Sequence, residues 1–246
     1  MAKKQRLDKA IAMQGSLSRS EVKTLIRKGA VTVNGQVVKN ADFGVDFDID
    51  TVAVQGKELS LSMHIYLMLN KPKGVVSASE DKKLPTVVDL VPKELWRKGL
   101  FPAGRLDKDT TGFVLITDDG EFAHDILSPK KHISKTYHAL VNGTITDEMV
   151  EGFAKGVTIG EDFTLPASLK KISSEEQGDW GEVILKEGMY HQIKRMFGAY
   201  GLKVLELKRV QMGKLPLDPN LEEGKCRELT AEELRLVSTR DESTEE

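Results

Sequence analysis

Residues 101–116 read FPAGRLDKDTTGFVLI, and the fold can be worked out from this stretch outward. Its second half, from Phe113, is an apolar run rich in β-formers, typical of a buried strand. Its first half is a loop in which Asp107 stands between two cations and two glycines. Loops on a rigid scaffold often carry catalytic groups, and nearby positive charge favours an ionised carboxylate. The stretch therefore predicts a loop that feeds a strand, with Asp107 available as nucleophile or base.

On the residues alone, Asp107 could have three different roles instead. Asp107, Asp109 and Asp118 partly follow an EF-hand loop, but the twelfth position is not Glu and suitable flanking helices are missing. Asp107 and Asp109 are poorly placed to face each other across a substrate as glycosidase carboxylates do. Simple turn chemistry at a strand entry explains many such segments. The loop by itself does not decide between a turn and a catalytic site.

The apolar pattern around this stretch predicts an α+β domain. Strand-like runs occupy residues 65–69, 112–117, 136–141, 165–172, 180–185 and 203–210. Helix signals occupy residues 121–127, 147–155, 190–199 and 231–237. Several strands follow one another without an intervening helix. We therefore expect a mainly antiparallel or mixed sheet flanked by helices, and not a doubly wound one.

The first forty residues form a basic segment. They hold nine Lys and Arg against two acidic residues, although the whole chain has a net charge of -2. Such a local field attracts phosphate backbones even when the whole protein is near neutral. A solvated charged face is the alternative. The segment indicates a nucleic-acid partner.

Local signals divide this basic segment into two helices and a hairpin. Leu7, Ala10 and Ile11 mark a short amphipathic helix, and residues 18–21 have the spacing of a capping box that opens a second one. Gly29 is expected to stop that second helix. Asn-Gly at 34–35, between two β-branched runs, is a strong hairpin signal because both residues tolerate positive φ.

The segment resembles the S4 RNA-binding domain over residues 3–55, through RLDK at 6–9, SRS at 18–20 and VTVNG at 31–35. A basic hairpin of helices that docks a protein partner is the alternative. We expect domain boundaries that give an S4-like domain at 1–58, a catalytic domain at 59–237 and an acidic, disordered tail at 238–246. The candidate RNA contacts of the S4-like domain are Arg6, Arg19, Lys23, Arg27 and Lys28.

The rest of the chain resembles the RsuA/RluA pseudouridine synthases. GRLD at 104–107, followed by TTG at 110–112 and LITDDG at 115–120, is similar to the catalytic motif of that family. Three more segments match in the same order: NKPKG at 70–74, KTY at 135–137 and EGMYHQIKRMF at 187–197. An S4 domain followed by a synthase domain is the order of the RsuA branch.

The resemblance implies roles for single residues. Asp107 is the essential carboxylate, acting at C1′ of the sugar or as a base toward a glycal. Lys194 forms an ion pair with Asp107, Tyr137 stacks on the target base, and Leu207 packs on the opposite face of the uracil. Arg105 holds the flipped nucleotide or fills its place. Further candidate RNA contacts are Lys71, Lys73 and Gln192, where the two lysines contact phosphate or support the active-site loop.

Within the RsuA branch the motifs look like the small-subunit enzyme, which implies uridine 516 of 16S ribosomal RNA, free or in an assembly intermediate, as substrate. Lys194 carries part of that distinction, because large-subunit relatives usually have Arg there. A 23S-directed synthase, a non-catalytic ribosome-assembly factor and a nucleoside glycosylase are the alternatives.

Isomerisation of uridine neither adds nor removes a group, so we expect no cofactor. The five histidines and Cys226 lack metal-ligand spacing, and we interpret the histidines as surface or structural residues. The longest apolar runs are far shorter than the roughly 20 residues of a membrane span. No secretory signal stands at the start, and one cysteine fits a reducing compartment. We expect a cytoplasmic monomer.

Overall fold

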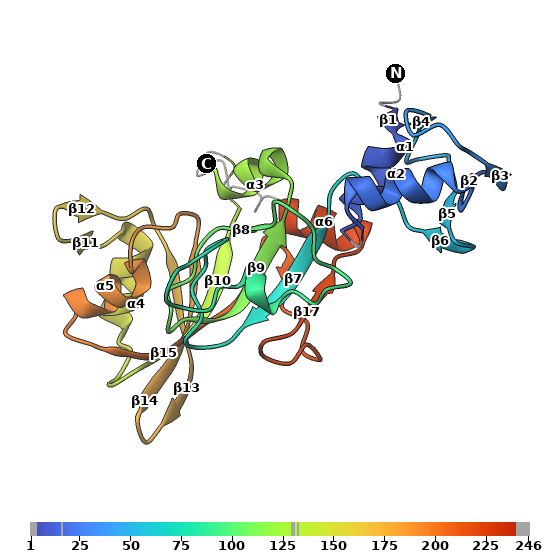
Figure 1. The fold of residues 1–246 in the computed structure, drawn as a ribbon. Coiled ribbons are helices and arrows are strands. Elements are labelled where there is room, and N and C mark those ends of the chain that lie inside the picture. The colour runs from blue at the N-terminus through green and yellow to red at the C-terminus, as the bar shows by residue number, and fades with distance from the viewer. Residues whose placement is uncertain (1–3, 16, 129–130, 132, 240–246) are drawn as a thin grey trace. The chain divides into compact units, whose positions relative to one another are not determined.

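The computed structural model describes residues 4–15, 17–128, 131 and 133–239. The chain forms two compact units. The N-terminal unit holds Met1–Ile65 with Val91–Leu100, and the C-terminal unit holds Tyr66–Leu90 with Phe101–Glu246. Each unit has a sheet and a hydrophobic core of its own (Figure 1). Within the described residues, no helix is long and apolar enough to cross a membrane.

The N-terminal unit packs two helices on a small sheet. Its helices are α1 (Leu7–Met13) and α2 (Arg19–Arg27). Its four-stranded sheet has the order β3-β2-β5-β6, and β1 pairs with β4. The strands are β1 (Gln5–Arg6), β2 (Val31–Val33), β3 (Gln36–Val37), β4 (Gly44–Val45), β5 (Val52–Val54) and β6 (Lys57–Leu59). All pairings in both sheets are antiparallel.

The local signals of the N-terminal unit are confirmed. Ser18 and Glu21 form the expected capping box at the start of α2. Asn34 and Gly35 take φ of 50° and 77° in the turn between β2 and β3. Gln55 and Gly56 form a second such turn between β5 and β6, in a region whose pattern predicts only a loosened linker. The predicted boundary at residue 58 falls inside β6, and the compact units part after Ile65.

The C-terminal unit is built on one nine-stranded sheet with the order β13-β14-β10-β15-β9-β7-β17, to which β8 and β16 add at β9 and β15. The strands are β7 (Tyr66–Lys71), β8 (Phe101–Ala103), β9 (Thr111–Thr117), β10 (Lys135–Val141), β13 (Ser168–Glu175), β14 (Gly178–Leu185), β15 (Val204–Met212), β16 (Leu215–Pro216) and β17 (Cys226–Glu228). β9 and β15 run parallel, and the other named pairings are antiparallel. The predicted α+β class with a mixed sheet is confirmed.

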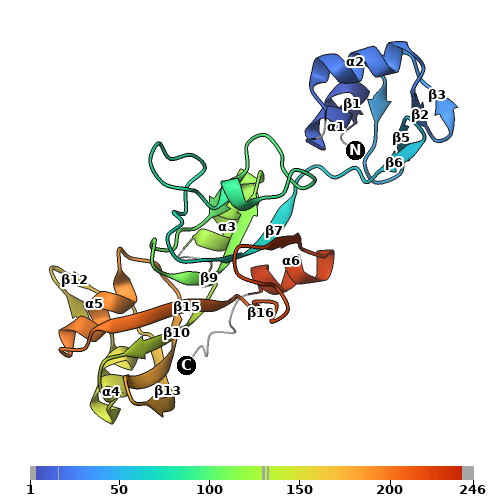
Figure 2. The same ribbon diagram turned by 60° about the horizontal axis from the view of Figure 1, so that its bottom comes forward.

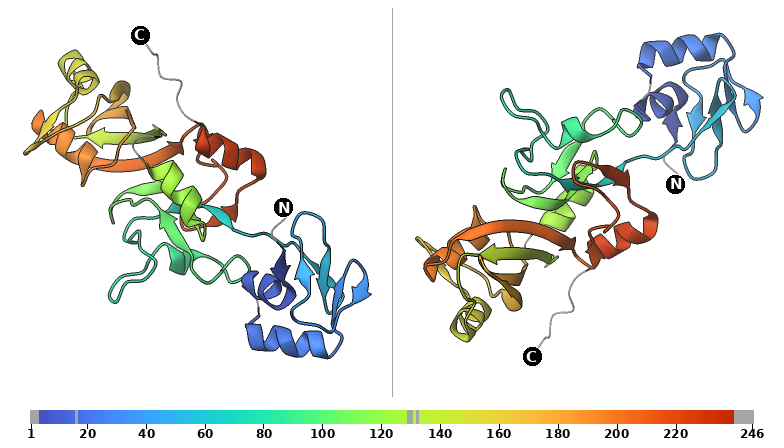
Figure 3. Two further views of the ribbon diagram at one scale, coloured as in Figure 1. Left: turned by 90° about the horizontal axis from the view of Figure 1, so that it is seen from above. Right: turned by 90° about the horizontal axis from the view of Figure 1, so that it is seen from below.

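Helices pack against several strands of this sheet. α4 packs on β13 and α5 on β15, whereas α3 contacts β8 and α6 contacts β16, as Figures 1 and 2 show. α3 and α6 also touch each other (Figure 3). The helices are α3 (Gly120–Leu127), α4 (Asp147–Lys155), α5 (Gln192–Ala199) and α6 (Ala231–Ser238); a short hairpin joins β11 (Thr158–Ile159) and β12 (Asp162–Phe163), and η1 covers Val88–Leu90.

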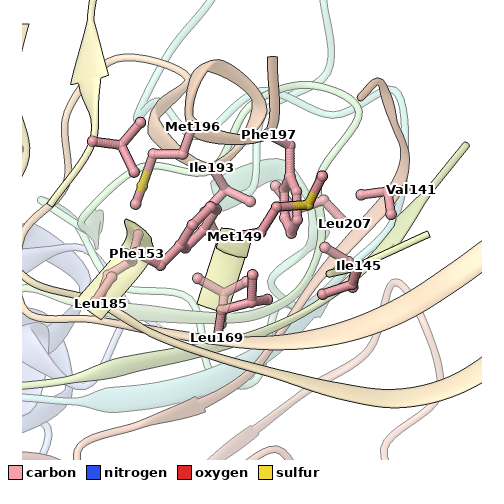
Figure 4. Packing of buried hydrophobic residues seen from close by; sticks show 14 of the residues in the cluster. Val141, Ile145, Met149, Phe153, Leu169, Leu185, Ile193, Met196, Phe197 and Leu207 are labelled. Carbon is pink, nitrogen blue, oxygen red and sulfur yellow. The ribbon is translucent and has the colours of Figure 1, made fainter. Parts of the chain in front are cut away.

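The larger core of the C-terminal unit lies between α4, α5 and the strands β10, β13, β14 and β15. Phe153 of α4 and Phe197 of α5 are fully buried at its centre, with ring centroids 5.1 Å apart (Figure 4). Leu207 of β15 belongs to the same cluster. Burying side chains of this size contributes about 1.5–3 kcal/mol each. The core therefore fixes α5 against β15, and the loop that enters α5 inherits that position.

The end of the chain is described only in part. α6 runs to Ser238 and is followed by Thr239. Most of the segment predicted to be a disordered tail, residues 240–246, lies outside the described residues.

Candidate active site

The loop from β8 to β9 presents Asp107. Gly104 and Gly112 bracket it with φ of 94° and 97°, a region that side chains rarely enter. The backbone N–H of Thr110 donates to the carbonyl of Asp107 at 3.1 Å, so the loop does contain a turn. The Ser77 hydroxyl meets both the N–H and the carbonyl of Leu106 at 3.0 Å. The turn predicted from the residues is therefore present, and it positions the Asp107 carboxylate.

Lys71, at the end of β7, supports this loop from below. Its side chain is fully buried, and its Nζ donates to the carbonyls of Pro72, Lys108 and Thr110 at 3.1, 3.1 and 2.8 Å. The alternative in which Lys71 contacts an RNA phosphate is not supported by this bonding, because Nζ is buried against three backbone carbonyls. The other alternative, support of the active-site loop, fits these contacts.

Asp107 meets one basic side chain on each carboxylate oxygen. Lys194 Nζ lies 3.0 Å from Oδ2, and His191 Nε2 lies 3.4 Å from Oδ1. The three side chains are partly exposed, between 26% and 37%. Two partners on opposite oxygens fix the rotation of the carboxylate, which is what a group that attacks or abstracts a proton along one direction needs.

A pocket opens in front of this carboxylate. Tyr137 lines it from β10 and Leu207 from β15, and these strands pair so that Tyr137 lies opposite Arg209 and Leu207 opposite Ala139. Residues two apart on a strand share a face, so Tyr137 and Leu207 reach the pocket from the same side of the sheet. A phenol ring, an isobutyl group and a fixed carboxylate suit a flat base attached to a sugar.

The other predicted contacts near the pocket are placed differently. Arg105 is exposed and lines the pocket mouth. Lys73 is exposed beside Glu206, with Nζ 3.8 Å from the carboxylate. Gln192 is buried, and its amide bonds with Glu187 at 2.7 Å and with the Met189 N–H at 2.9 Å. Gln192 therefore shapes the loop that enters α5, and the prediction that it contacts RNA is not supported by its bonding.

His191 is a neighbour of Asp107 that the sequence alone does not identify. Because the histidines lack metal-ligand spacing, His191 is interpreted from the sequence only as a surface or structural residue. His191 takes φ 50° and ψ 34° at the start of α5, a left-handed conformation that is uncommon outside glycine. Its ring stacks on Tyr190 with centroids 3.8 Å apart. The sequence feature that could have identified His191 is its position in the segment 187–197, three residues before Lys194.

The cations of the N-terminal unit gather around one buried carboxylate. Asp8 is fully buried, and Arg6, Arg19 and Lys23 approach it at 3.1, 3.2 and 3.8 Å. Burial alone would raise the pKa of Asp8, but hydrogen bonds from Arg6 and Arg19 hold this pKa below its ordinary value. Arg27 and Lys28, at the end of α2, are exposed. Asp8 therefore orients three of the five predicted RNA contacts.

Two buried lysines make the stability of the C-terminal unit depend on pH. Burial lowers the pKa of Lys71 and of Lys135 from 10.5 to about 8. For Lys71 the carboxylates of Asp109 and Asp107 partly oppose this, whereas Arg209 lowers the pKa of Lys135 further. The unfolded state thus binds these protons more tightly, so stability is diminished below about pH 8 and recovered as pH rises toward 10.5.

We therefore expect the free energy of unfolding of the wild type to rise relative to that of Lys135→Met between about pH 8 and 10.5. The rise should be about 1.4 kcal/mol per unit of pKa difference. Urea denaturation of both proteins across this range measures it. Cys226, whose pKa burial raises to about 11, is common to both proteins and cancels. If the free energies of unfolding of the two proteins changed with pH in parallel, burial of the charged Lys135 would not destabilise the folded state.

Comparisons with known proteins agree with this architecture. The family model for RNA pseudouridylate synthase matches residues 65–199, and that for the S4 domain matches residues 5–48. An uncharacterized RNA pseudouridine synthase of Bacillus subtilis is 44% identical, covering 95% of this chain and 98% of that protein. Ribosomal small subunit pseudouridine synthase A of Escherichia coli K12 is 43% identical, covering 94% and 99%.

A crystal structure of a pseudouridylate synthase has the same fold. It is 37% identical, has a TM-score of 0.63 and covers 94% of this chain and 99% of that one. These findings confirm both resemblances drawn from the motifs. The chain belongs to the RNA pseudouridylate synthase family, with an N-terminal S4 domain before its synthase domain.

Proposed function

We propose that this RNA pseudouridine synthase modifies small-subunit ribosomal RNA, with uridine 516 of 16S RNA as its target. The observation that carries the chemistry is Asp107, held by Lys194 at 3.0 Å in a pocket with Tyr137 and Leu207. Relatives more than 40% identical over nearly their whole length, from Salmonella typhimurium and Escherichia coli, are named for the small subunit. The protein works as a cytoplasmic monomer.

Asp107 acts on the sugar of the flipped uridine, as the nucleophile at C1′ or as the base toward a glycal. Lys194 keeps this carboxylate charged and oriented. Tyr137 stacks on the uracil and assists loss of the proton from C5, while Leu207 supports the other face of the ring. The C1′–N1 bond breaks, the uracil turns, and a C1′–C5 bond forms; C5 gives up its proton and N1 gains one, so the composition of the RNA is unchanged. Arg105 at the pocket mouth holds the extruded nucleotide, which offsets an unstacking cost of a few kcal/mol.

The target is tested by incubating the purified protein with 16S RNA, free and partly assembled with small-subunit proteins, and mapping pseudouridine by carbodiimide-blocked primer extension. We expect one stop, at uridine 516. A 16S transcript with cytidine at that position and a 23S transcript are the controls. A stop in 23S RNA alone would assign the large-subunit function. RNA mass stays constant in isomerisation and falls if a glycosylase releases uracil.

The S4 domain supplies electrostatic RNA contacts. Replacing Lys23 and Arg27 of α2 together by Gln should weaken RNA binding and lower the slope of log affinity against log salt by about one for each phosphate that is no longer neutralised. Filter binding across a salt series measures this. Lys57→Gln, which removes a cation from β6 on another part of the same unit, is the matched control. An unchanged slope in the double variant would mean that α2 does not face the RNA.

A further inference from the structure

Two cations are buried beside the catalytic pocket. Lys135 of β10 is 7% exposed and Arg209 of β15 is 3% exposed. Lys135 Nζ donates to the carbonyl of Ile133 at 2.7 Å, and Arg209 Nε donates to that of Phe113 at 2.7 Å. Arg209 Nη2 is buried and has no hydrogen-bond partner among the described residues. Among the residues that the structure describes, neither Lys135 nor Arg209 forms an ion pair with a carboxylate.

Buried positive charge of this kind is costly unless an anion compensates it. The penalty for each buried ion is several kcal/mol, and a partly satisfied guanidinium adds the cost of an unmade hydrogen bond. The pKa of Lys135 is lowered first by its burial and further by repulsion from Arg209. Replacing a buried charge by apolar residues is often neutral or stabilising, so stability alone does not explain two cations at this place. A compensating anion is therefore expected when the protein is at work.

The place of the pair indicates where the anion comes from. Arg209 lies opposite Tyr137 in the β10–β15 ladder, and Lys135 precedes Tyr137 by two residues. Both cations line a hollow that also contains Asp107 and Tyr137. The carboxylates in this hollow are engaged elsewhere: Asp107 with Lys194 and His191, Glu187 with Gln192, and Asp81 with backbone N–H groups. An anion that enters with the substrate is what remains.

We propose that Lys135 and Arg209 form a binding site for one backbone phosphate of the RNA, next to the uridine held at Asp107. This inference rests on the proposed function and names a contact of the same site. The guanidinium offers Nη2 to a phosphate oxygen, and the ammonium of Lys135 adds a point charge. Because the site forms part of the floor beside Tyr137, it positions the extruded nucleotide by its backbone while the ring is held separately. The uracil can then turn without release of the sugar.

The test uses an RNA fragment that the wild type converts, with a single uncharged methylphosphonate placed at one linkage at a time around the target uridine. One linkage should lower wild-type affinity about tenfold to a hundredfold, the value of a charge-assisted hydrogen bond. Lys135→Met should bind unmodified RNA more weakly and show a smaller loss than the wild type at that linkage, because only Arg209 is left to contact the phosphate. Lys135→Gln removes the charge but keeps a hydrogen-bond donor for the Ile133 carbonyl, and its affinities for the same RNAs provide a second comparison with the wild type.

Lys208→Met is the matched control, since it removes a lysine next to Arg209 on the opposite face of β15. It should keep the wild-type penalty at the sensitive linkage. The urea midpoint of Lys135→Met at pH 7 should be unchanged or higher, because a buried charge is removed. A penalty that is equal in wild type and Lys135→Met, or absent in both, overturns the phosphate site. Failure of the wild type to convert the unmodified fragment counts against the proposed function instead.

Discussion

Replacing Asp107 by Asn should lower the rate of pseudouridine formation at least about a thousandfold while RNA affinity stays within about twofold. The amide keeps the shape of the carboxylate but can neither attack C1′ nor accept a proton, and it loses the ion pair with Lys194. The S4 domain and the cations around Asp8 are untouched, so most RNA contacts remain. Single-turnover conversion and filter binding on the same RNA measure the two effects.

The matched control is Asp109→Asn, which removes a carboxylate from the same loop but from an exposed position. It should change the rate far less. Retained turnover in Asp107→Asn would remove the catalytic assignment. Equal losses in both variants would point to the charge of the loop, and not to Asp107, as the quantity that matters.

Gly112→Ala should lower the free energy of unfolding by about 3 kcal/mol, a large loss for so small a change. A Cβ at position 112 would stand 2.2 Å from the carbonyl oxygen and 2.9 Å from the nitrogen of Arg209, and the φ of 97° is unfavourable for any side chain. Gly112 and Arg209 are register partners in the parallel β9–β15 pair. The substitution therefore drives apart the two strands that carry the Asp107 loop and Leu207. Urea denaturation measures the change.

Gly120→Ala is the matched control for this prediction. Gly120 begins α3, and a Cβ there meets nothing within 4 Å. Alanine favours helix over glycine by about 1 kcal/mol, so this variant should be as stable as the wild type or more so. A Gly112→Ala protein with an unchanged urea midpoint would mean that the parallel contact is looser than the structure shows.

Much of the fold could be predicted because its signals are local. The helix Asp147–Lys155 is predicted with its observed bounds, since Thr146 caps it and Gly156 ends it. The strand β17 is missed, because Cys226–Glu228 is short and polar and becomes a strand only by pairing with β7, more than 150 residues earlier. The helix predicted from Tyr190 starts instead at Gln192, because His191 takes a left-handed conformation that no propensity predicts.

The candidate site was predictable to the extent that motifs name residue types. They identified Asp107, Tyr137, Lys194 and Leu207, which the structure brings to one pocket. The motifs could not show which way a side chain points. Lys71 and Gln192 face inward to carbonyl and carboxylate groups, whereas His191 turns toward Asp107. Whether a polar side chain meets substrate or backbone depends on burial, which a single sequence does not specify.

The position of β15 between β9 and β10 has a consequence for the order in which the protein becomes active. Strands β9 and β10 follow each other in the chain but do not pair, and the last strand to form the pocket, β15, begins some sixty residues after β10 ends. During synthesis, domains fold from the N-terminus onward, and long-range pairing is slow. A nascent chain can therefore display a finished RNA-binding domain well before it can modify anything. The chain becomes catalytically competent only when β15 has left the ribosome and paired with β9 and β10.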